Sequence, residues 1–376
     1  MKKFRFLLPL FFLLALLTVV VPGIPAVGQA QPGRSDIRGV WLTSNDMDTW
    51  RDRAKVQQAV AQLRQLNFNT IYPVVWNAGY ATYPSAVTQR QKIQDFTYKG
   101  LEGQDILADL INQAHAQGLL VMPWFEFGFM APPTSELALQ HPNWLTQKRD
   151  GGQTSISAAG EVVWLNPFHP EVQKFMTDLV LEVVTQYDVD GIQFDDHTSL
   201  PSEFGYDAYT IALYTRETKK APPANAQDSA WIKWRADKIT AFMQRLHQAV
   251  SARKPKAIFS VSPNYYDFAY KLQLQDWLTW VRRNIADEII VQVYRPDLPS
   301  FLPQLTRPEI QETGLRNRPA PMWLIQSQVR AAQERGLGVS FFYYETLWNS
   351  TGEDPNTRRS GFQALFPTPA SRSLPQ

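Results

Sequence analysis

Residues 190–197 read Asp-Gly-Ile-Gln-Phe-Asp-Asp-His (DGIQFDDH), and this stretch decides the fold. Side chains alternate along a β-strand, so Ile192 and Phe194 point to one face and Gln193 and Asp195 to the other. The two apolar side chains suit a covering layer of helices, which leaves Gln193 and Asp195 on the inner face of a barrel. Asp196 has the opposite parity, so it reaches the same site only if the chain has already turned. The stretch therefore predicts a buried strand that presents Asp195 at its end.

Apolar runs and amphipathic segments alternate along most of the chain, which is typical of βα units with parallel strands. We predict strands at residues 37–43, 70–76, 119–125, 191–195, 257–262, 288–294 and 339–344. We predict helices at residues 55–66, 104–117, 171–187, 231–251, 272–285 and 322–335. Seven or eight units over about 310 residues favour a (β/α)8 TIM barrel with enlarged loops. An open doubly wound sheet would need a Gly-rich turn after the first strand, where this chain has Thr43 to Asp46.

The seventh strand is the weak point of this prediction. Residues 295–322 are rich in proline and contain no β-branched run, and proline removes the hydrogen-bond donor that a strand needs. We therefore expect a weak or missing seventh strand, with either a gap or a polar, irregular strand near residues 312–316. We assign residues 36–348 to the barrel. Residues 349–376 are rich in Pro, Ser, Thr and Arg, so we expect a flexible tail there.

The first thirty residues have the pattern of an export signal. Lys2, Lys3 and Arg5 precede an apolar stretch of about sixteen residues, and small residues such as Ala30 follow the helix breakers. We expect a signal peptide over residues 1–30, a mature chain that starts near Gln31, and a periplasmic or extracellular location. An uncleaved, short membrane anchor is the alternative. The later sequence has no comparable apolar run, so we expect no stable membrane insertion after cleavage.

Composition excludes several classes of function. Without the first thirty residues the chain is close to neutral and has no basic run, so we expect no nucleic-acid partner. The chain has no cysteine, which excludes disulfides, thiolate metal sites and a cysteine nucleophile. The five histidines are scattered, and residues 195–197 on an extended backbone would not all face one ion. We therefore expect no metal and no cofactor. A serine-hydrolase elbow motif is absent as well.

In a barrel of this type the active site lies at the carboxyl ends of the strands. Four carboxylates stand at such ends and are candidates for acid, base or nucleophile: Asp195, Asp196, Glu126 and Glu345. Aromatic rings stack on pyranose faces, and amides bind hydroxyl groups. The candidate substrate-binding residues are Trp41, Trp76, Trp124, Trp164, Gln193, His197, Tyr265, Gln292 and Tyr294. Rim packing of the aromatic rings and helix capping by the glutamates are the structural alternatives. Carboxylates beside aromatic and amide side chains favour glycoside hydrolysis.

Several motifs together resemble those of the glycosyl-hydrolase-like 10 family of bacterial envelope proteins. They are DIRGVWLT at 36–43, FNTIYPVVW at 68–76, WLNPFHP at 164–170, DGIQFDDH at 190–197 and FFYYETLW at 341–348. WFEFGFMAPP at 124–133 resembles the cyanobacterial branch of that family. The resemblance implies a TIM barrel that cleaves peptidoglycan glycan strands or a similar polysaccharide.

The pattern DGI-x-x-D is also similar to the fourth-strand motif of the alpha-amylase superfamily, in which the last Asp is the nucleophile and matches Asp195. Gln193 stands where amylases have an Arg, and the fifth strand has no Glu to match their acid. The identity of the general acid is therefore open.

Two hypotheses follow. In the first, Asp195 is the nucleophile or charge stabiliser, and Glu126, Glu345 or Asp196 is the general acid. In the second, the barrel binds a polysaccharide without cleaving it. A second carboxyl group across the barrel mouth and within about 10 Å of Asp195 would favour the enzyme, because both glycosidase geometries need one.

Overall fold

The structure is a computed structural model that describes residues 36–94, 103–310, 314–317, 320–349 and 352–372. Eight strands form one sheet, and every pairing in it is parallel. In spatial order the strands are β5 (Leu120–Val121), β2 (Thr70–Pro73), β1 (Arg38–Leu42), β13 (Val339–Phe341), β12 (Gly314–Asn317), β11 (Glu288–Gln292), β10 (Ile258–Ser262) and β9 (Gly191–Asp195). This confirms the predicted α/β class with parallel strands.

The first and last strands of this order are joined at Trp124. Trp124 forms single parallel bridges to Val74, just after β2, and to Gln193 of β9. The Gln193 amide donates to the Pro123 carbonyl at 2.8 Å, and the Phe125 amide donates to the Gln193 carbonyl at 2.9 Å. Within the described residues no continuous ladder of hydrogen bonds closes the sheet into a barrel, but these bridges connect its two edges.

Helices follow the strands as the sequence predicts. The main ones are α2 (Arg53–Gln65), α4 (Ile106–Ala116), α6 (Pro170–Gln186), α8 (Ser229–Arg253), α10 (Trp277–Arg282) and α12 (Met322–Gln333). In α2 the Asp52 side chain caps the amino end, and the apolar face is buried. The predicted helix at 272–285 is instead split between α9 (Tyr266–Gln273) and α10, because Leu274 adopts a left-handed φ of 55° that ends α9.

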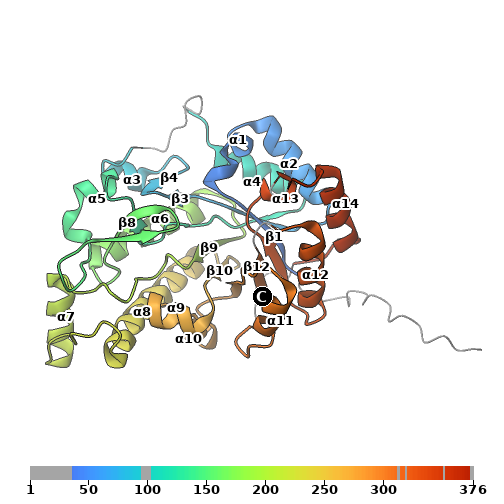
Figure 1. The fold of residues 1–376 in the computed structure, drawn as a ribbon. Coiled ribbons are helices and arrows are strands. Elements are labelled where there is room, and N and C mark those ends of the chain that lie inside the picture. The colour runs from blue at the N-terminus through green and yellow to red at the C-terminus, as the bar shows by residue number, and fades with distance from the viewer. Residues whose placement is uncertain (1–35, 95–102, 311–313, 318–319, 350–351, 373–376) are drawn as a thin grey trace, which may run out of the picture. The chain divides into compact units, whose positions relative to one another are not determined.

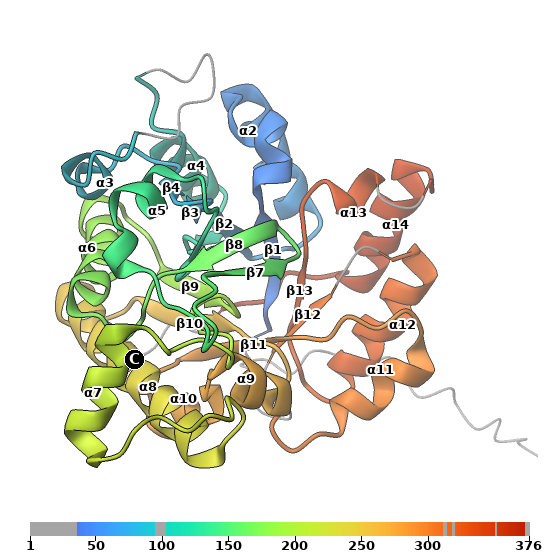
Figure 2. The same cartoon turned by 60° about the vertical axis from the view of Figure 1, so that its left-hand side comes forward.

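Shorter elements fill the connections. The helical ones are α1 (Met47–Trp50), α3 (Ala86–Arg90), α5 (Glu136–Gln140), α7 (Ala208–Thr218), α11 (Leu298–Leu305), α13 (Thr346–Asn349) and α14 (Pro355–Leu365), with 3-10 turns at Ser44–Asp46 and Pro142–Trp144. The small antiparallel sheets contain β3 (Trp76–Asn77) with β4 (Tyr80–Ala81), and β6 (Met130–Ala131) with β8 (Gly160–Trp164) and β7 (Thr154–Ser157). Figures 1 and 2 show α12 beside α14, and α9 and α10 near α8.

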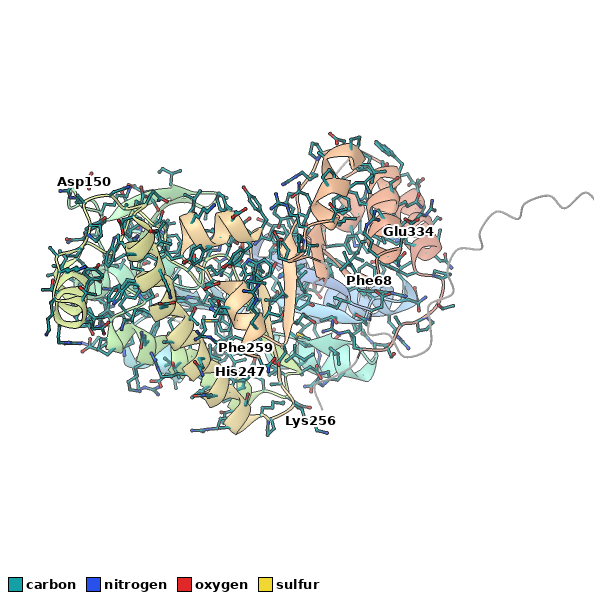
Figure 3. The ribbon with its side chains drawn as sticks, turned by 90° about the horizontal axis from the view of Figure 1, so that it is seen from below. Phe68, Asp150, His247, Lys256, Phe259 and Glu334 are labelled. Atoms are coloured by element: carbon teal, nitrogen blue, oxygen red, sulfur yellow. The ribbon has the colours of Figure 1, made fainter. Side chains whose placement is uncertain are left out.

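Alternation along the strands separates the apolar layer from the polar interior. Phe194 of β9 contacts Phe125 and Phe259, with ring centroids 5.4 and 5.3 Å apart. Phe259 of β10 also meets His247 of α8 at 5.4 Å, and Figure 3 shows these two side chains next to each other. The prediction that Phe194 and Phe259 face the helices is therefore confirmed.

A short seventh strand is present, so the sheet has no gap here, and the expected alternative of a strand near residues 312–316 is the one that the structure matches. β12 is four residues long and pairs in parallel with both neighbours, so that Leu315 lies opposite Val291 on one side and Val339 on the other. The prolines of residues 295–322 all lie outside these four residues, so every position in the strand keeps its amide donor. Counting prolines over the whole segment concealed a short strand that contains none.

Residues 349–376 are not a flexible tail over the part that the structure describes. Phe362, Leu365 and Phe366 in and after α14 are buried, and Phe68 contacts both phenylalanine rings at 5.8 and 5.6 Å. The tail composition predicted disorder because its apolar side chains are few, but those few pack together in the core.

The expected signal peptide lies outside the described residues. Among the helices that the structure does describe, none has the length and apolar character needed to cross a membrane.

Candidate active site

The chain turns directly after β9, and this turn builds the site. β9 ends at Asp195, and residues 196 and 197 form a turn. One side-chain atom each of Asp195, Asp196 and His197 consequently lies within 4.8 Å of the other two. Our expectation that three adjacent residues could not face one point is wrong, because it assumed that the extended backbone continued.

Asp195 lies at the bottom of the site, where only 2% of it is exposed. Its Oδ2 accepts a hydrogen bond from the Trp124 indole at 3.2 Å, and its Oδ1 accepts one from the His197 backbone amide at 3.0 Å. The His197 Nδ1 lies 3.1 Å from the same Oδ1. These contacts fix the carboxylate in one orientation and place positive charge beside it.

His197 is the positive group of the site. Burial lowers its pKa, but the negative charges of Asp195, Asp196 and Glu126 together raise it to about 10. Its Nδ1 also lies 2.9 Å from the Glu126 carbonyl oxygen, which fits a protonated nitrogen that donates. In its protonated form His197 neutralises part of the negative charge of this site.

Asp196 is half-buried and is held by three amide side chains. Its Oδ1 accepts from Gln292 Nε2 at 2.7 Å. Its Oδ2 accepts from Asn264 Nδ2 at 3.0 Å and from Gln273 Nε2 at 3.1 Å. We call Asn264, Gln273 and Gln292 the amide cluster. Amide N–H donors stabilise negative charge on a carboxylate and fix where it points.

The other two candidate carboxylates are also half-buried and lie near strand ends. Glu126 follows Phe125, and its side chain accepts a hydrogen bond from Asn77. Glu345 follows β13. When the Trp124 bridges join the two ends of the eight-stranded order into a ring, β13 is four strands away from β9 in both directions. Glu126 therefore stands on the Asp195 side of the site, and Glu345 stands on the opposite side.

All four of the predicted sugar-stacking tryptophans are buried, and three of them are almost completely so, which makes the expectation wrong for these three. Trp41, Trp76 and Trp124 are 0, 0 and 1% exposed. Trp41, Trp124 and Phe342 contact one another edge-on, with centroids 6.1 to 6.4 Å apart, and form an aromatic layer beneath Asp195. Trp76 packs against Phe175 instead. Large rings close to the axis of a barrel fill the interior space that smaller side chains would leave empty.

The remaining predicted binding residues have mixed positions. Trp164 lies 6.5 Å from the His197 ring, but it is only 4% exposed, and its indole donates to Ser155. Tyr265 and Tyr294 are half-buried, and the Arg307 guanidinium lies 5.0 Å from the Tyr265 ring.

The two predicted glutamines take structural roles. Gln193 is buried and donates to Ser260 at 3.1 Å, so it lines the barrel interior below the site. Gln292 belongs to the amide cluster and holds Asp196.

Sequence reasoning missed Asn264 and Gln273. Asn264 follows β10 by two residues, so the rule that selected the other strand ends could have found it. Gln273 is the last residue of α9, which returns to the site from an insertion after β10. Nothing in the spacing of the sequence connects Gln273 to Asp196.

The parallel strands and the helices that follow them give a (β/α)8-type fold of the kind that glycan-acting hydrolases have. The chain belongs to the Glycosyl hydrolase-like 10 family, whose model matches residues 36–329.

Two curated relatives carry the name glycosyl hydrolase. The chain is 27% identical to Glycosyl hydrolase DigH of Escherichia coli (strain K12) over 308 residues, which cover 71% of this chain and 67% of DigH. It is 23% identical to Glycosyl hydrolase YngK of Bacillus subtilis (strain 168) over 270 residues, which cover 67% of this chain and 49% of YngK.

The PgaB (BpsB) glycoside hydrolase domain from Bordetella bronchiseptica has a similar structure. It superposes with a TM-score of 0.64 at 14% identity, over 88% of this chain and 99% of that domain. At this level of identity the likeness concerns the fold alone.

Proposed function

We propose that the chain is an exported glycoside hydrolase that cleaves a polysaccharide at the site around Asp195. The observation that carries the proposal is the pair of carboxylates at the end of β9, those of Asp195 and Asp196. One oxygen atom of each lies within 4.8 Å of the other, and the protonated His197 lies beside them. Glycoside hydrolases hold carboxyl groups at fixed positions around the bond that breaks, and we propose Asp195 as one of them. Asp196 lies beside Asp195 rather than across the mouth, so the partner that we expect across the mouth is proposed from Glu126 and Glu345.

The two aspartates have a common role in this proposal. The Trp124 indole and the His197 cation stabilise negative charge on Asp195, and the amide cluster does so on Asp196. Negative charge fixed in advance stabilises the oxocarbenium-like transition state of glycoside cleavage. Asp195 then serves as nucleophile or charge stabiliser. A separate acid, Glu126 or Glu345, protonates the leaving group.

The proposed substrate is a polysaccharide, in particular the glycan strands of peptidoglycan. Membership of a glycosyl-hydrolase-like family and the carboxylates at the strand ends support a glycan. The test is the release of reducing ends from denuded peptidoglycan and from storage glucans by the purified chain. Release from a glycan supports the proposal, and which glycan is cleaved defines the linkage. Binding to a glycan with no release from any of them would favour the binding-protein hypothesis.

Export is proposed from the sequence of residues 1–30. N-terminal sequencing of the protein recovered from its producing cell should find a start near Gln31 in the fraction outside the cytoplasmic membrane. Recovery of the full-length chain in the membrane fraction alone would contradict export with cleavage.

A further inference from the structure

Asp46 is a fully buried carboxylate that the proposed function does not use. It lies four residues after the end of β1, and its Oδ2 accepts from the Thr43 amide at 2.7 Å and from the Thr43 hydroxyl at 3.2 Å. The bond from the Thr43 amide is one half of a capping box around the turn at Ser44–Asp46, and the Thr43 side chain accepts from a backbone amide in the other half. Capping explains one of its carboxylate oxygens.

The other oxygen has a partner far away in the sequence. Asp46 Oδ1 accepts a hydrogen bond of 2.8 Å from the backbone amide of Glu345. β1 and β13 are neighbouring strands, so this bond joins the loops that follow them on the same side of the sheet. Asp46 therefore fixes the position from which the Glu345 side chain extends.

The surroundings of Asp46 are acidic and phenolic. Burial raises its pKa to about 7, although the hydrogen bonds from Thr43 and from the Glu345 amide oppose this shift, and the negative charge of Glu345 adds to it. The titratable groups that face Asp46 are Glu345 and the phenols of Tyr343 and Tyr344. Two carboxyl groups therefore lie close together after β1 and β13, on the part of the strand order opposite β9.

We propose that Asp46 is a positioning residue that holds Glu345 on the wall opposite Asp195, and that Glu345 is the general acid. This inference rests on the proposed function. Glu345 gives its carboxyl proton to the glycosidic oxygen while the bond from C1 to that oxygen breaks, and the electron pair of the bond stays on the oxygen. The carboxylate of Asp195 balances the positive charge at C1. Water then adds to C1, and its proton passes to the Glu345 carboxylate.

Glu126, the other candidate acid, is less suited to this role. Glu126 lies on the Asp195 side of the strand order, whereas Glu345 follows a strand four positions away, so Glu345 is the candidate that can stand across the mouth from Asp195.

The first test measures kcat and KM for glycan hydrolysis in four variants. Glu345→Gln should lower kcat by roughly 10²- to 10⁴-fold, which is the usual contribution of a general acid. Asp46→Asn should lower kcat by roughly 10- to 100-fold with little change in KM, because a displaced acid reacts slowly. The double variant should be no slower than Glu345→Gln alone, since both changes remove one function. Asp207→Asn is the matched control, because Asp207 is another buried capping carboxylate and should affect melting temperature only.

The second test needs no catalysis. Hydrogen exchange at the Glu345 amide should accelerate at least tenfold in Asp46→Ala and stay unchanged in Asp207→Asn, because only Asp46 accepts that hydrogen. Additive losses of kcat, or unchanged exchange at Glu345, would overturn the role of Asp46. If the wild-type chain cleaves no glycan, the proposed function and the acid role fail together, and amide exchange alone still decides the positioning role.

Discussion

At the scale of single residues, the positive charge of His197 allows several carboxylates to lie close together in the site. Three carboxylates, those of Asp195, Asp196 and Glu126, act on its imidazole and raise its pKa. Without a cation at this position, Asp195 would be a buried charge with only neutral hydrogen-bond donors among its described partners. The cation therefore belongs to the same unit as the carboxylate that we propose for the reaction.

This unit makes protein stability depend on pH in a defined direction. The pKa of His197 lies above its value in the unfolded chain, so its contribution is fully present below about pH 6.5 and is lost as pH rises toward about 10. Melting temperatures of the wild type and of His197→Gln should differ most near pH 6 and converge near pH 10. A difference that stays constant across this range would show that His197 is neutral in the folded protein.

Gln292 allows the roles of positioning and substrate binding to be separated. Because its amide holds Asp196 Oδ1 at 2.7 Å, Gln292→Ala should lower kcat by roughly tenfold and leave KM nearly unchanged. Steady-state kinetics on a cleaved glycan would measure both constants. A large rise in KM at constant kcat would restore the substrate contact that the sequence alone predicted.

Individual site residues were predictable where a local rule applied. Strand alternation correctly placed Gln193 and Asp195 on the inner face, because the period of two is fixed by backbone geometry. Alternation did not show that Trp41 and Trp124 fill the barrel interior. It tells which face of the sheet a side chain is on, but not whether that side chain lies at the mouth or in a layer below it. Gln273 was not predictable, because its contact with Asp196 depends on the path of α9.

At the scale of secondary structure, close contact between β9 and β10 depends on one glycine. A Cβ atom at Gly191 would lie 2.3 Å from the Ile258 carbonyl oxygen, which is backbone and cannot rotate away. Gly191→Ala should therefore separate the two strands and destabilise the chain by about 1 to 3 kcal/mol. Urea unfolding measures this change.

Gly152→Ala is the control for that substitution. A Cβ at Gly152 would meet only the flexible side chains of Asp150 and Lys148, so its urea midpoint should stay close to that of the wild type. If Gly191→Ala unfolds at the same urea concentration as the control, the strands are not as tightly packed as the structure indicates.

Strands and helices with a strong period were predictable from the sequence, and β9 has the predicted bounds. β12 lies close to the strand that the sequence offered near residues 312–316 as an alternative to a gap. Its regular pairing was not predictable, because four residues are too few for a pattern and the neighbouring strands supply its hydrogen bonds. The split between α9 and α10 was missed for a related reason. Leu274 adopts its left-handed conformation although its residue type does not favour it.

At the scale of the whole described unit, the C-terminal segment contributes a buried ion pair at the end of the sheet opposite the site. Arg372 lies 2.6 Å from Glu288, the first residue of β11, and both side chains are less than 10% exposed. Tyr72 and Ser260 donate to the other oxygen of Glu288 at 3.1 and 2.8 Å. Through Glu288, the segment after α14 is therefore connected to side chains of β2, β10 and β11.

Removal of this arginine should destabilise the fold strongly. Arg372→Met leaves Glu288 buried without its cation, and breaking a buried pair in this way costs about 3 to 5 kcal/mol. A second change, Glu288→Gln, should recover part of the loss because it removes the uncompensated charge. Urea midpoints of the single and double variants would measure both effects. A single variant as stable as the wild type would mean that residues after α14 do not stabilise the barrel.

The central claim is that Asp195 supplies the negative charge for glycoside cleavage. Its most direct test compares Asp195→Asn with the wild type for both binding and cleavage of a glycan that the wild type hydrolyses. Asn keeps the size of the side chain and removes its charge, so the account predicts retained binding and a rate of reducing-end release lower by roughly 10³-fold or more. Hydrolysis at the wild-type rate by Asp195→Asn would contradict the account and transfer the role to Asp196, Glu126 or Glu345.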